Sequence, residues 1–553
     1  MYTSVTNTNH RLTFLQILIG LCVLLNLSGL FVTILGPDGA LYASIAKTMV
    51  QKNNYIELFS RGTDWLDKPH LPFWITAFFF KLFGFTTWAY KLPGILFFLM
   101  GTRYTYLFAK DFYNKEIALW AVLILLTTQH IITSNNDVRA EAYLTGFIIA
   151  AVYYFHKLID TKKFLPLLLA SFFTALAIMT KGMFALIPIG GAIAGSLLIQ
   201  KNWKDLFHTR WLMAGLLIMI FILPEIYCLY YQFDVHPEKL VFGQHNVSGI
   251  KFFFWDSQFG RFFNTGPIKG KGHTFFFFHT LLWAFLPWSI LLYCALGKLF
   301  KSLLQRDLLH KEWFSFAGAL LTFILFSLSK FQLPHYLNIV YPFFAIITAN
   351  YLFTLHKRVF HYLKAIQNII LLLLSAGVVL LYIFYADNIN WSLLITIVVA
   401  FILVFVFPEK LLNNARERLV VKSVLVSIII NLYLNLYLYP SLLTYQSGSQ
   451  AAFFVNKNYK DLPVIEINKF SWPMEFYLNS PVYMLDSSKL NLPSGSYLIY
   501  IATPDVNFLQ SKGIKYETIS KFADFKVSQL SLNFINKKRR LSTLSEYQLL
   551  LVK

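Results

Sequence analysis

The sequence has few charged residues and very little cysteine. Asp, Glu, Lys and Arg make up 14% of the chain, whereas soluble domains contain about 25%, and hydrophobic residues make up 57%. The three cysteines, Cys22, Cys228 and Cys294, all lie in apolar stretches, and no CxxC pair occurs. These shortages argue against a soluble domain, a disulfide framework and a thiolate metal site. They favour a polytopic membrane protein.

Acidic residues are scarcer than basic ones. The chain has 27 Asp and Glu against 48 Lys and Arg, which gives a formal net charge of +21. In a soluble protein this excess would suggest a nucleic-acid partner, but no basic module interleaved with aromatic residues is present. The excess is better explained by Lys and Arg gathered in cytoplasmic loops. We therefore expect a lipid bilayer around the chain and no nucleic-acid partner.

Apolar runs long enough to span a bilayer recur as far as residue 439. The run 71–109 is too long for one simple span and contains Lys81, Lys91 and Pro93, so it predicts either two helices or one bent helix. The run 12–35 is too long for a signal-peptide core and is expected to be retained. The sequence thus predicts about thirteen crossings, at 12–35, 71–109, 117–134, 140–156, 164–180, 183–200, 211–231, 274–297, 313–329, 335–355, 365–385, 391–407 and 420–439.

Charge placement predicts the topology. Alternate loops are basic, and the positive-inside rule places them in the cytoplasm together with the N-terminus: 110–115, 156–163, 200–210, 297–311, 356–364 and 409–422. The same alternation places the other loops on the outer face: 36–70, the turn near 135–138, the break at 180–182, the long loop 232–273, and 329–335. We expect a multi-pass protein of a bacterial inner membrane with a periplasmic C-terminal part.

Residues 441–553 have a different character. They are polar, with short alternating apolar runs that predict strands at 462–468, 481–485, 496–502, 515–522 and 547–552, and helical pieces at 450–459, 472–479 and 504–512. The segment has the size of one small α/β domain. Its basic run at 535–542 predicts a hairpin turn with a solvated charged face, the alternative being a contact with anionic lipid.

Two carboxylates of the outer face stand directly before apolar helical sequence. Asp38 follows a Gly-Pro break and Asp137 closes the turn before residue 140. Each could simply cap the helix that follows it. The alternative is that both face one cavity, where one acts as a general base and the other orients a cation or a sugar.

Cations and histidines accompany these carboxylates. Lys68, between Asp67 and Pro69, could snorkel to the interface or hold a phosphate, to which an ammonium is well suited. The other outer cations point to an anionic ligand: Arg61, Lys181, Arg261, Lys269, Lys271 and Lys330. The outer histidines have no helical HxxxH spacing, so structural roles compete with a metal site that includes Asp67: His70, His245, His273 and His335.

Six segments, in their order and spacing over about residues 1–440, resemble the GT-C glycosyltransferases. The branch is that of the protein O-mannosyltransferases and the lipid A aminoarabinose transferases. The segments are PDGALYASIAKTMV, DWLDKPHLPFW, TSNNDVRAEAYLTGF, IMTKGMFALIP, HTFFFFHTLLWAFLPWS and FSLSKFQLPHYLNIVYP. The resemblance implies a polytopic α-helical membrane protein of GT-C type, about thirteen transmembrane helices in residues 1–440, with a small extracytoplasmic α/β domain at 441–553.

The resemblance also implies a reaction. A sugar would pass, with inversion, from a polyprenyl-phosphate donor to a lipid A-like glycolipid or a protein hydroxyl on the extracytoplasmic face. The rivals are a transporter or flippase for a lipid-linked anion, an O-antigen-ligase-like enzyme that moves a whole polyprenyl-linked glycan, and a non-catalytic scaffold. A flippase would carry charges in mid-span and repeated halves, which the sequence does not show.

The resemblance implies roles for individual residues, by their positions in the matching segments. Asp38 is expected to be the catalytic acidic residue and Asp137 the second acid, while Lys68 and Arg261 are expected at the donor phosphate. Asp67 stands where relatives have a glutamate that binds metal, and with His273 it is the candidate ligand pair for a divalent metal ion; no other cofactor is expected. Gly39 stands where many relatives carry a second acid. The remaining expected substrate-binding residues are Tyr42, Lys181, Lys330, His335 and Tyr336.

Overall fold

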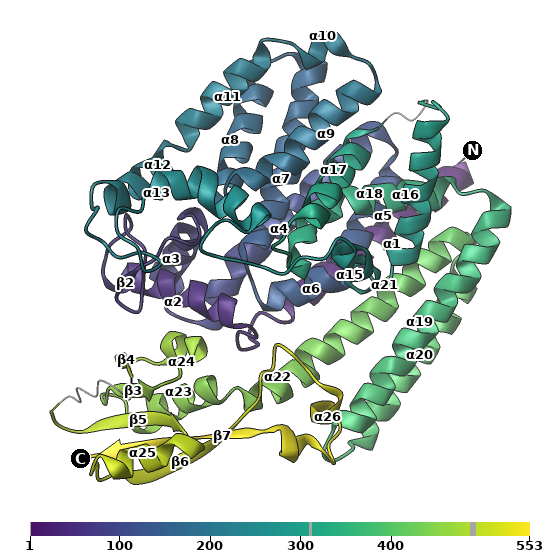
Figure 1. The fold of residues 1–553 in the computed structure, drawn as a ribbon. Coiled ribbons are helices and arrows are strands. Elements are labelled where there is room, and N and C mark those ends of the chain that lie inside the picture. Colours follow the sequence, from purple (N-terminus) through teal and green to yellow (C-terminus); the bar gives the residue numbers. More distant parts are fainter. Residues whose placement is uncertain (1, 309–311, 487–493) are drawn as a thin grey trace.

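The computed structural model describes residues 2–308, 312–486 and 494–553 and is mostly helical (Figure 1). Helices fill the part of the chain before residue 440, and a small sheet follows below them in the view. Each apolar run expected from the sequence contains helix. Up to residue 234 the helices are α1 (Tyr2–Leu27), α2 (Pro37–Gln51), α3 (Leu71–Phe83), α4 (Thr87–Phe112), α5 (Lys115–Leu126), α6 (Gln129–Asn136), α7 (Ala140–Thr161), α8 (Phe164–Lys181), η1 (Met183–Ala185), α9 (Leu186–Ile199), α10 (Trp203–Leu206), α11 (Arg210–Phe221), α12 (Leu223–Leu229) and η2 (Tyr230–Asp234).

The segment 232–273, expected to be a long loop, contains a helical stretch at 249–263 made of α13 (Gly249–Lys251), η3 (Phe252–Gly260) and α14 (Arg261–Phe263). This stretch places Arg261 at its end. The later helices of the bundle are α15 (Phe276–Ala284), α16 (Ser289–Leu304), α17 (Phe314–Leu328), η4 (Pro334–Val340), α18 (Tyr341–Thr354), α19 (Lys357–Tyr385), α20 (Trp391–Leu411), α21 (Ala415–Tyr433), η5 (Leu434–Leu438), α22 (Tyr439–Leu442) and η6 (Leu443–Tyr445).

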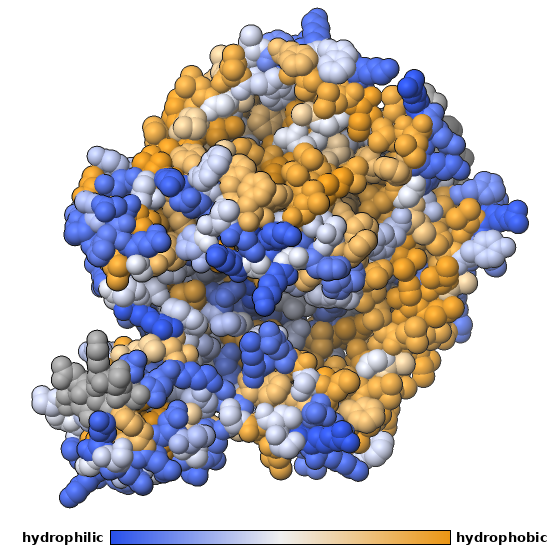
Figure 2. All heavy atoms as spheres, viewed as in Figure 1, coloured by the Kyte–Doolittle hydropathy of each residue, from blue (hydrophilic) through white to orange (hydrophobic). Residues whose placement is uncertain are grey.

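Among the described residues, six helices are long and apolar enough to cross a bilayer, and two bent helix pairs would raise the number to eight. Four further apolar helices are shorter. Two of the expected runs are visibly broken: α5 and α6, one of the bent pairs, meet at 51°, and the run 71–109 divides at Gly84 into α3 and α4. Figure 2 shows the hydrophobic surface that these helices leave outside, including the long α19 and α20.

Helix α7 is packed between α4 and α8, and this packing depends on small residues. A Cβ on Gly146 of α7 would collide with the carbonyl oxygen of Phe97 in α4, and one on Gly101 of α4 would lie 2.8 Å from the Cα of Gly146. Glycine pairs of this kind let membrane helices approach closely. The close contact fixes the start of α7, which carries acidic and basic side chains of the outer face.

The C-terminal sheet has the strand order β4-β3-β5-β7-β6. Strands β3 (Val464–Ile467), β4 (Val482–Leu485) and β5 (Tyr497–Ala502) pair in parallel, while β7 (Ser545–Val552) runs antiparallel to β5 and to β6 (Glu517–Asp524). Each expected strand run overlaps one of these strands. The helices α23 (Ser447–Asn458), α24 (Trp472–Tyr477) and α25 (Val506–Ser511) overlap the three expected helical pieces.

The basic run at 535–542 turns between the end of α26 (Leu532–Ile535) and η8 (Arg540–Thr543), and it is not a hairpin between strands. Its Lys538 and Arg539 are exposed, as expected of a solvated face, but Arg540 is buried. Arg540 pairs with Asp387 at 3.0 Å and donates to the carbonyl of Tyr385, so it joins the C-terminal part to the end of α19. The expectation was wrong for Arg540 because this residue serves a contact between segments far apart in sequence.

The outer loop 36–70 is held against the C-terminal part by two cations. Nζ of Lys47 in α2 donates to the carbonyls of Glu475, Phe476 and Leu478, at 3.1, 3.0 and 2.6 Å, at the end of α24. Arg61 forms the turn between β1 (Phe59–Ser60) and β2 (Thr63–Asp64), and its guanidinium lies over the rings of Phe470 and Trp472. Helix α2 is therefore fixed by the C-terminal part as well as by the bundle.

Candidate functional site

Asp38 and Asp137 meet at one arginine. Nη1 of Arg139 lies 2.9 Å from Oδ2 of Asp38, and its Nη2 and Nε lie 2.8 and 3.0 Å from Oδ2 of Asp137. The Asp38 side chain is 47% exposed and that of Asp137 is 12% exposed. Burial would lower the pKa of Arg139, but the carboxylates of Asp137 and Asp38 raise it above its usual value. The two acids and the arginine form an outer cluster with net charge −1.

Neither acid caps a helix. The N-cap of α2 is Gly36 and that of α7 is Arg139, and neither makes a side-chain cap bond. Oδ1 of Asp137 instead accepts a hydrogen bond of 3.0 Å from the backbone N–H of Gly36, which stands 101 positions earlier in the chain. Simple capping, one of the two alternatives from the sequence, is therefore wrong for both residues.

Glycines make room for the Asp137 carboxylate. A Cβ on Gly39 would lie 2.5 Å from Oδ1 of Asp137 and 2.9 Å from Cγ2 of Ile34, and a Cβ on Gly36 would also collide with Asp137. Pro37 begins α2 at the first helical position, where proline is well accommodated. The Gly-Pro-Asp-Gly sequence thus starts α2, and because its glycines have no side chains it leaves space for the Asp137 carboxylate.

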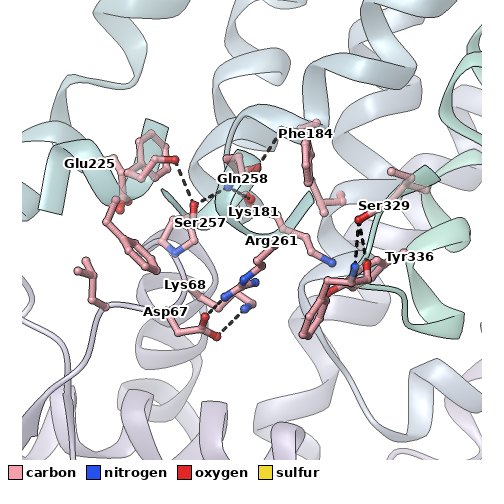
Figure 3. A pocket seen from close by; sticks show the side chains of 18 of the residues that line it. Asp67, Lys68, Lys181, Phe184, Glu225, Ser257, Gln258, Arg261, Ser329 and Tyr336 are labelled. Carbon is pink, nitrogen blue, oxygen red and sulfur yellow. Dashed lines mark hydrogen bonds and ion pairs between the residues drawn. The ribbon is translucent and has the colours of Figure 1, made fainter. Parts of the chain in front are cut away.

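A second cluster consists of Asp67, Lys68 and Arg261 (Figure 3). Nζ of Lys68 lies 2.6 Å from Oδ2 of Asp67, and Nη2 of Arg261 pairs with Oδ1 of the same carboxylate. Nε of Arg261 is buried without a hydrogen-bond partner among the described residues. One acid against two bases leaves a net charge of +1, and an unused guanidinium donor is available for an anion.

Charge and burial shift the titration of this second cluster. Burial alone would raise the pKa of the Asp67 carboxyl, but the ammonium of Lys68 and the guanidinium of Arg261 hold it below its usual range. Burial lowers the pKa of Lys68 despite the opposing effect of Asp67. An anionic ligand beside Lys68 would therefore favour its charged form and would gain from the contact.

Lys181 and Glu141 form a third pair between α8 and α7. Nζ of Lys181 pairs with Oε1 of Glu141 and lies 3.8 Å from the ring centre of Tyr336, while Nε2 of His335 lies 3.7 Å from the same Glu141 oxygen. Nδ1 of His335 also lies 3.4 Å from Nη1 of Arg139, which connects this pair to the outer cluster.

A glutamine holds the chain break after Lys181. Gly182 ends α8 with a φ of 89°, and a Cβ there would collide with the Gln258 side chain. The amide of Gln258 donates to the carbonyl of Lys181 at 3.3 Å and accepts from the N–H of Phe184 at 3.2 Å. The π-helical segment η3 thereby fixes the end of α8 and the direction of Lys181.

A cavity lies beside the positive cluster, with a volume of about 870 Å³ including its open mouth (Figure 3). Its polar lining includes Asp67, Lys68, Lys181 and Arg261, and most of the rest is apolar: Leu66, Pro69, Leu144, Phe184, Ala185, Leu229, Phe252, Phe253, Phe326, Phe331, Tyr336 and Ile339. A smaller cavity of about 330 Å³ is lined by Tyr42, Lys68, Arg139 and Thr180 among others, so it adjoins both clusters. Asp38 and Asp137 line neither cavity, and Arg139, which contacts both acids, lines the smaller one.

Several predicted residues take other positions. Lys330 is exposed, and its backbone N–H donates to the carbonyl of Phe262. His273 binds Gln332 through its N–H and the N–H of Phe275 through Nδ1. His70 is a structural residue, since its ring nitrogens lie 3.0 Å from Glu225 and 2.9 Å from the carbonyl of Ile56.

No group of three or more His, Cys, Asp or Glu side chains that could hold a metal ion occurs in the described part of the chain. Both oxygens of Asp67 are already bound by cations, which makes the carboxylate a poor ligand while those contacts last. The pair Asp67 and His273 remains a prediction from the resemblance.

Sequence reasoning did not assign Arg139 and Glu141. Both stand next to Asp137 in the segment DVRAE, immediately before an apolar helix. Charged residues at the start of a buried helix cost free energy unless they are paired. The segment DVRAE alone could therefore have indicated that both residues have partners. Their partners come from α2, α8 and η4, and no local pattern identifies them.

Residues 67–228 match the model of the dolichyl-phosphate-mannose-protein mannosyltransferase family. An uncharacterized protein of Aquifex aeolicus is 29% identical over 62% of this chain and 63% of its own length. The undecaprenyl phosphate-alpha-4-amino-4-deoxy-L-arabinose arabinosyl transferase of Edwardsiella ictaluri is 25% identical over 57% of this chain and 55% of its own length. The chain thus spans between half and two thirds of the length of these curated relatives.

The crystal structure of ArnT from Cupriavidus metallidurans bound to undecaprenyl phosphate superposes on the chain with a TM-score of 0.75, over 97% of this chain and 98% of that one, at 16% identity. The chain has the ArnT fold. The apo structure of the same ArnT gives a TM-score of 0.73. The GT-C resemblance and the helical membrane fold with a small C-terminal sheet, both predicted from the sequence, are confirmed.

Proposed function

We propose that this protein is a membrane glycosyltransferase that moves a sugar from a polyprenyl-phosphate donor to an acceptor on the extracytoplasmic face. The acceptor would be a lipid A-like glycolipid or a protein hydroxyl, and the anomeric configuration would be inverted. The N-terminus would be cytoplasmic and the C-terminal sheet periplasmic. The ArnT fold and the names of the arabinosyl transferase relatives support this class of reaction.

The observation that carries the proposal is the position of the positive cluster beside an apolar cavity. Asp67, Lys68 and Arg261 together leave one positive charge, and Nε of Arg261 has no described partner. A phosphate on a long hydrocarbon chain fits both features, because the oxygens meet the cations and the chain meets apolar side chains. A water-soluble sugar nucleotide would leave the apolar lining without a partner.

The chemistry follows from the two clusters. An acceptor oxygen would attack the anomeric carbon as the bond from that carbon to the phosphate oxygen breaks, and the electron pair would stay on the phosphate. Lys68 and Arg261 would stabilise the phosphate as it leaves. Asp38, half exposed and with Oδ1 without a described partner, would take the acceptor proton, and Asp137 would hold Arg139 in place. The sugar would lie on the side of Lys68 that faces Arg139, where the two clusters adjoin.

The test is transfer of label from a polyprenyl-phosphate-linked sugar pool to membrane lipid or protein. Charge stabilisation at a reacting centre contributes roughly 3–4 kcal/mol, so Asp38→Asn and Lys68→Ala should each slow transfer on the order of a hundredfold or more. Asp461→Asn, an exposed carboxylate of the C-terminal part, is the control and should leave the rate unchanged. Rates near wild type in both site variants would reject the assignment.

The labelled product separates the alternatives. Label in lipid A supports a lipid-modifying enzyme, and label in protein supports the O-glycosylating branch. Transfer of a whole glycan would indicate an O-antigen-ligase-like reaction. A lipid-linked sugar that only changes membrane face, with no new product, would indicate a flippase and would overturn the proposal.

A further inference from the structure

A third cavity lies at the ends of α4, α7 and α8 that are far from the site. It has a volume of about 1050 Å³ including its open mouth, and it is enclosed by α4, α7 and the start of α8. The lining contains three cations and three tyrosines with a rim of apolar side chains: Arg103, Lys157, Lys163, Tyr104, Tyr153, Tyr154, Met100, Leu107, Leu165 and Pro166, with Thr161.

Helix geometry places this cavity at the opposite membrane face from the site. In α7, Glu141 belongs to the site and Lys157 lines the cavity, and sixteen residues of helix span about 24 Å. The same spacing separates Leu165 at the cavity from Lys181 at the site in α8. This is most of the thickness of the hydrocarbon core of a bilayer, about 30 Å, so the cavity would lie near the boundary between that core and the head groups of the other leaflet.

The cations of the cavity are only partly neutralised. Lys157 pairs with Asp111 at 2.6 Å, whereas Arg103 and Lys163 are exposed and make no ion pair with any described residue. No acidic residue is among those that line the cavity. The carboxylate of Asp160 also acts on Lys157, so Asp111 and Asp160 against the three bases leave a net charge of +1 around the space, which favours an anionic ligand.

Three tyrosines, Tyr104, Tyr153 and Tyr154, form part of the wall of this cavity. The hydroxyls of Tyr104 and Tyr154 lie 3.1 Å apart, and the ring of Tyr154 stacks on Phe173 with an interplanar angle of 5°. Nζ of Lys157 lies 5.6 Å from the ring centre of Tyr153. Phenolic hydroxyls and cations at head-group depth, above apolar side chains, match a ligand with an anionic head and hydrocarbon tails.

We propose that this cavity binds the head group of an anionic glycerophospholipid of the leaflet opposite the catalytic site. The phosphate would lie between Arg103 and Lys163, the tyrosine hydroxyls would bind the glycerol or ester oxygens, and the acyl chains would follow Leu107 and Leu165 into the bilayer. Basic pockets between membrane helices on the cytoplasmic side bind lipids of this class. Such a lipid would tie α4 to α8, whose other end carries Lys181.

The experiment measures lipid binding to the full chain in neutral detergent. Phosphatidylglycerol, phosphatidylcholine and inorganic phosphate are titrated separately, and bound lipid is counted by native mass spectrometry. We expect phosphatidylglycerol to bind more tightly than phosphatidylcholine. Arg103→Gln and Lys163→Gln should each weaken phosphatidylglycerol binding roughly fivefold, and the double variant roughly 25-fold, since each surface cation contributes about that factor.

Two control variants test whether phosphatidylglycerol binds in this cavity. Lys204→Gln removes an exposed cation of α10 outside the cavity and should leave binding unchanged. Lys68→Gln tests whether the lipid occupies the catalytic cavity instead, and it should also leave binding unchanged. If the double variant does not fold, the single exposed Lys163→Gln variant is sufficient for the comparison.

Three results would overturn the proposal. They are equal affinity for the two lipids, loss of phosphatidylglycerol binding in Lys68→Gln with retention in the cavity variants, and inorganic phosphate binding as tightly as the lipid. The last would identify a site for soluble phosphate. None of these outcomes depends on sugar transfer, so the proposal can fail or succeed independently of the proposed enzymatic function.

Discussion

Replacement of Arg139 by lysine tests whether the outer cluster works as a unit. Arg139 uses Nη1 for Asp38 and Nη2 and Nε for Asp137, three contacts between 2.8 and 3.0 Å made by a planar fork. A lysine retains the charge but carries its three donors on one atom, so it cannot reproduce the planar fork that contacts both carboxylates at these distances. A hydrogen bond between charged groups contributes about 1.5–3 kcal/mol, so loss of the Asp38 contact should slow transfer roughly 10- to 150-fold.

The assay is the rate of sugar transfer at saturating donor, measured for Arg139→Lys beside Arg358→Lys, an exposed arginine at the start of α19. Thermal unfolding of both variants shows whether the folded fraction is retained. We expect a folded Arg139→Lys protein with slow transfer and a control at the wild-type rate. A wild-type rate in Arg139→Lys, or a loss of rate that only follows a loss of folded protein, would refute the reasoning.

Two further predictions follow from the fold around the site. Gly39→Ala should slow transfer at least tenfold in a folded protein, because its Cβ would lie 2.5 Å from Oδ1 of Asp137, whereas Gly20→Ala in α1 meets no atom within 4 Å and should be neutral; equal rates in the two would contradict the tight fit. Burial raises the pKa of Glu475 from 4.5 to about 7, so the folded state holds this proton more tightly than the unfolded chain, and stability should fall as pH rises from about 4.5 to about 7. Glu475→Gln should flatten that part of the curve of melting temperature against pH, and an unchanged curve would show that other groups cause the dependence.

The sequence predicted most of the fold because local patterns encode it. Apolar runs located the helices, and alternation located all five strands of the C-terminal sheet. The division of 71–109 remained open because Lys81 and Pro93 fit either alternative, and the structure places the break at Gly84. The burial of Arg540 was not predicted because its partner, Asp387, is about 150 residues away in the chain.

The site was predicted in part for the same reason. Asp38, Asp137 and Lys68 could be recognised because each is a charge at the edge of an apolar run. That Arg139 joins the two acids is a property of tertiary packing, since Asp38 and Asp137 lie a hundred residues apart in the chain. Lys330 carried the same local signal and is exposed in the structure, which shows that position at the membrane edge does not determine where a side chain points.

The contact between Lys47 and α24 has a consequence for how this protein can be divided. A chain shortened to end at residue 440 would lose all three carbonyl acceptors of a lysine that is 7% exposed, and α2, which carries Asp38, would lose its support. The C-terminal part is therefore not an accessory that can be exchanged freely. A recombined relative would keep this support of α2 only if the incoming C-terminal part offered equivalent carbonyls to Lys47.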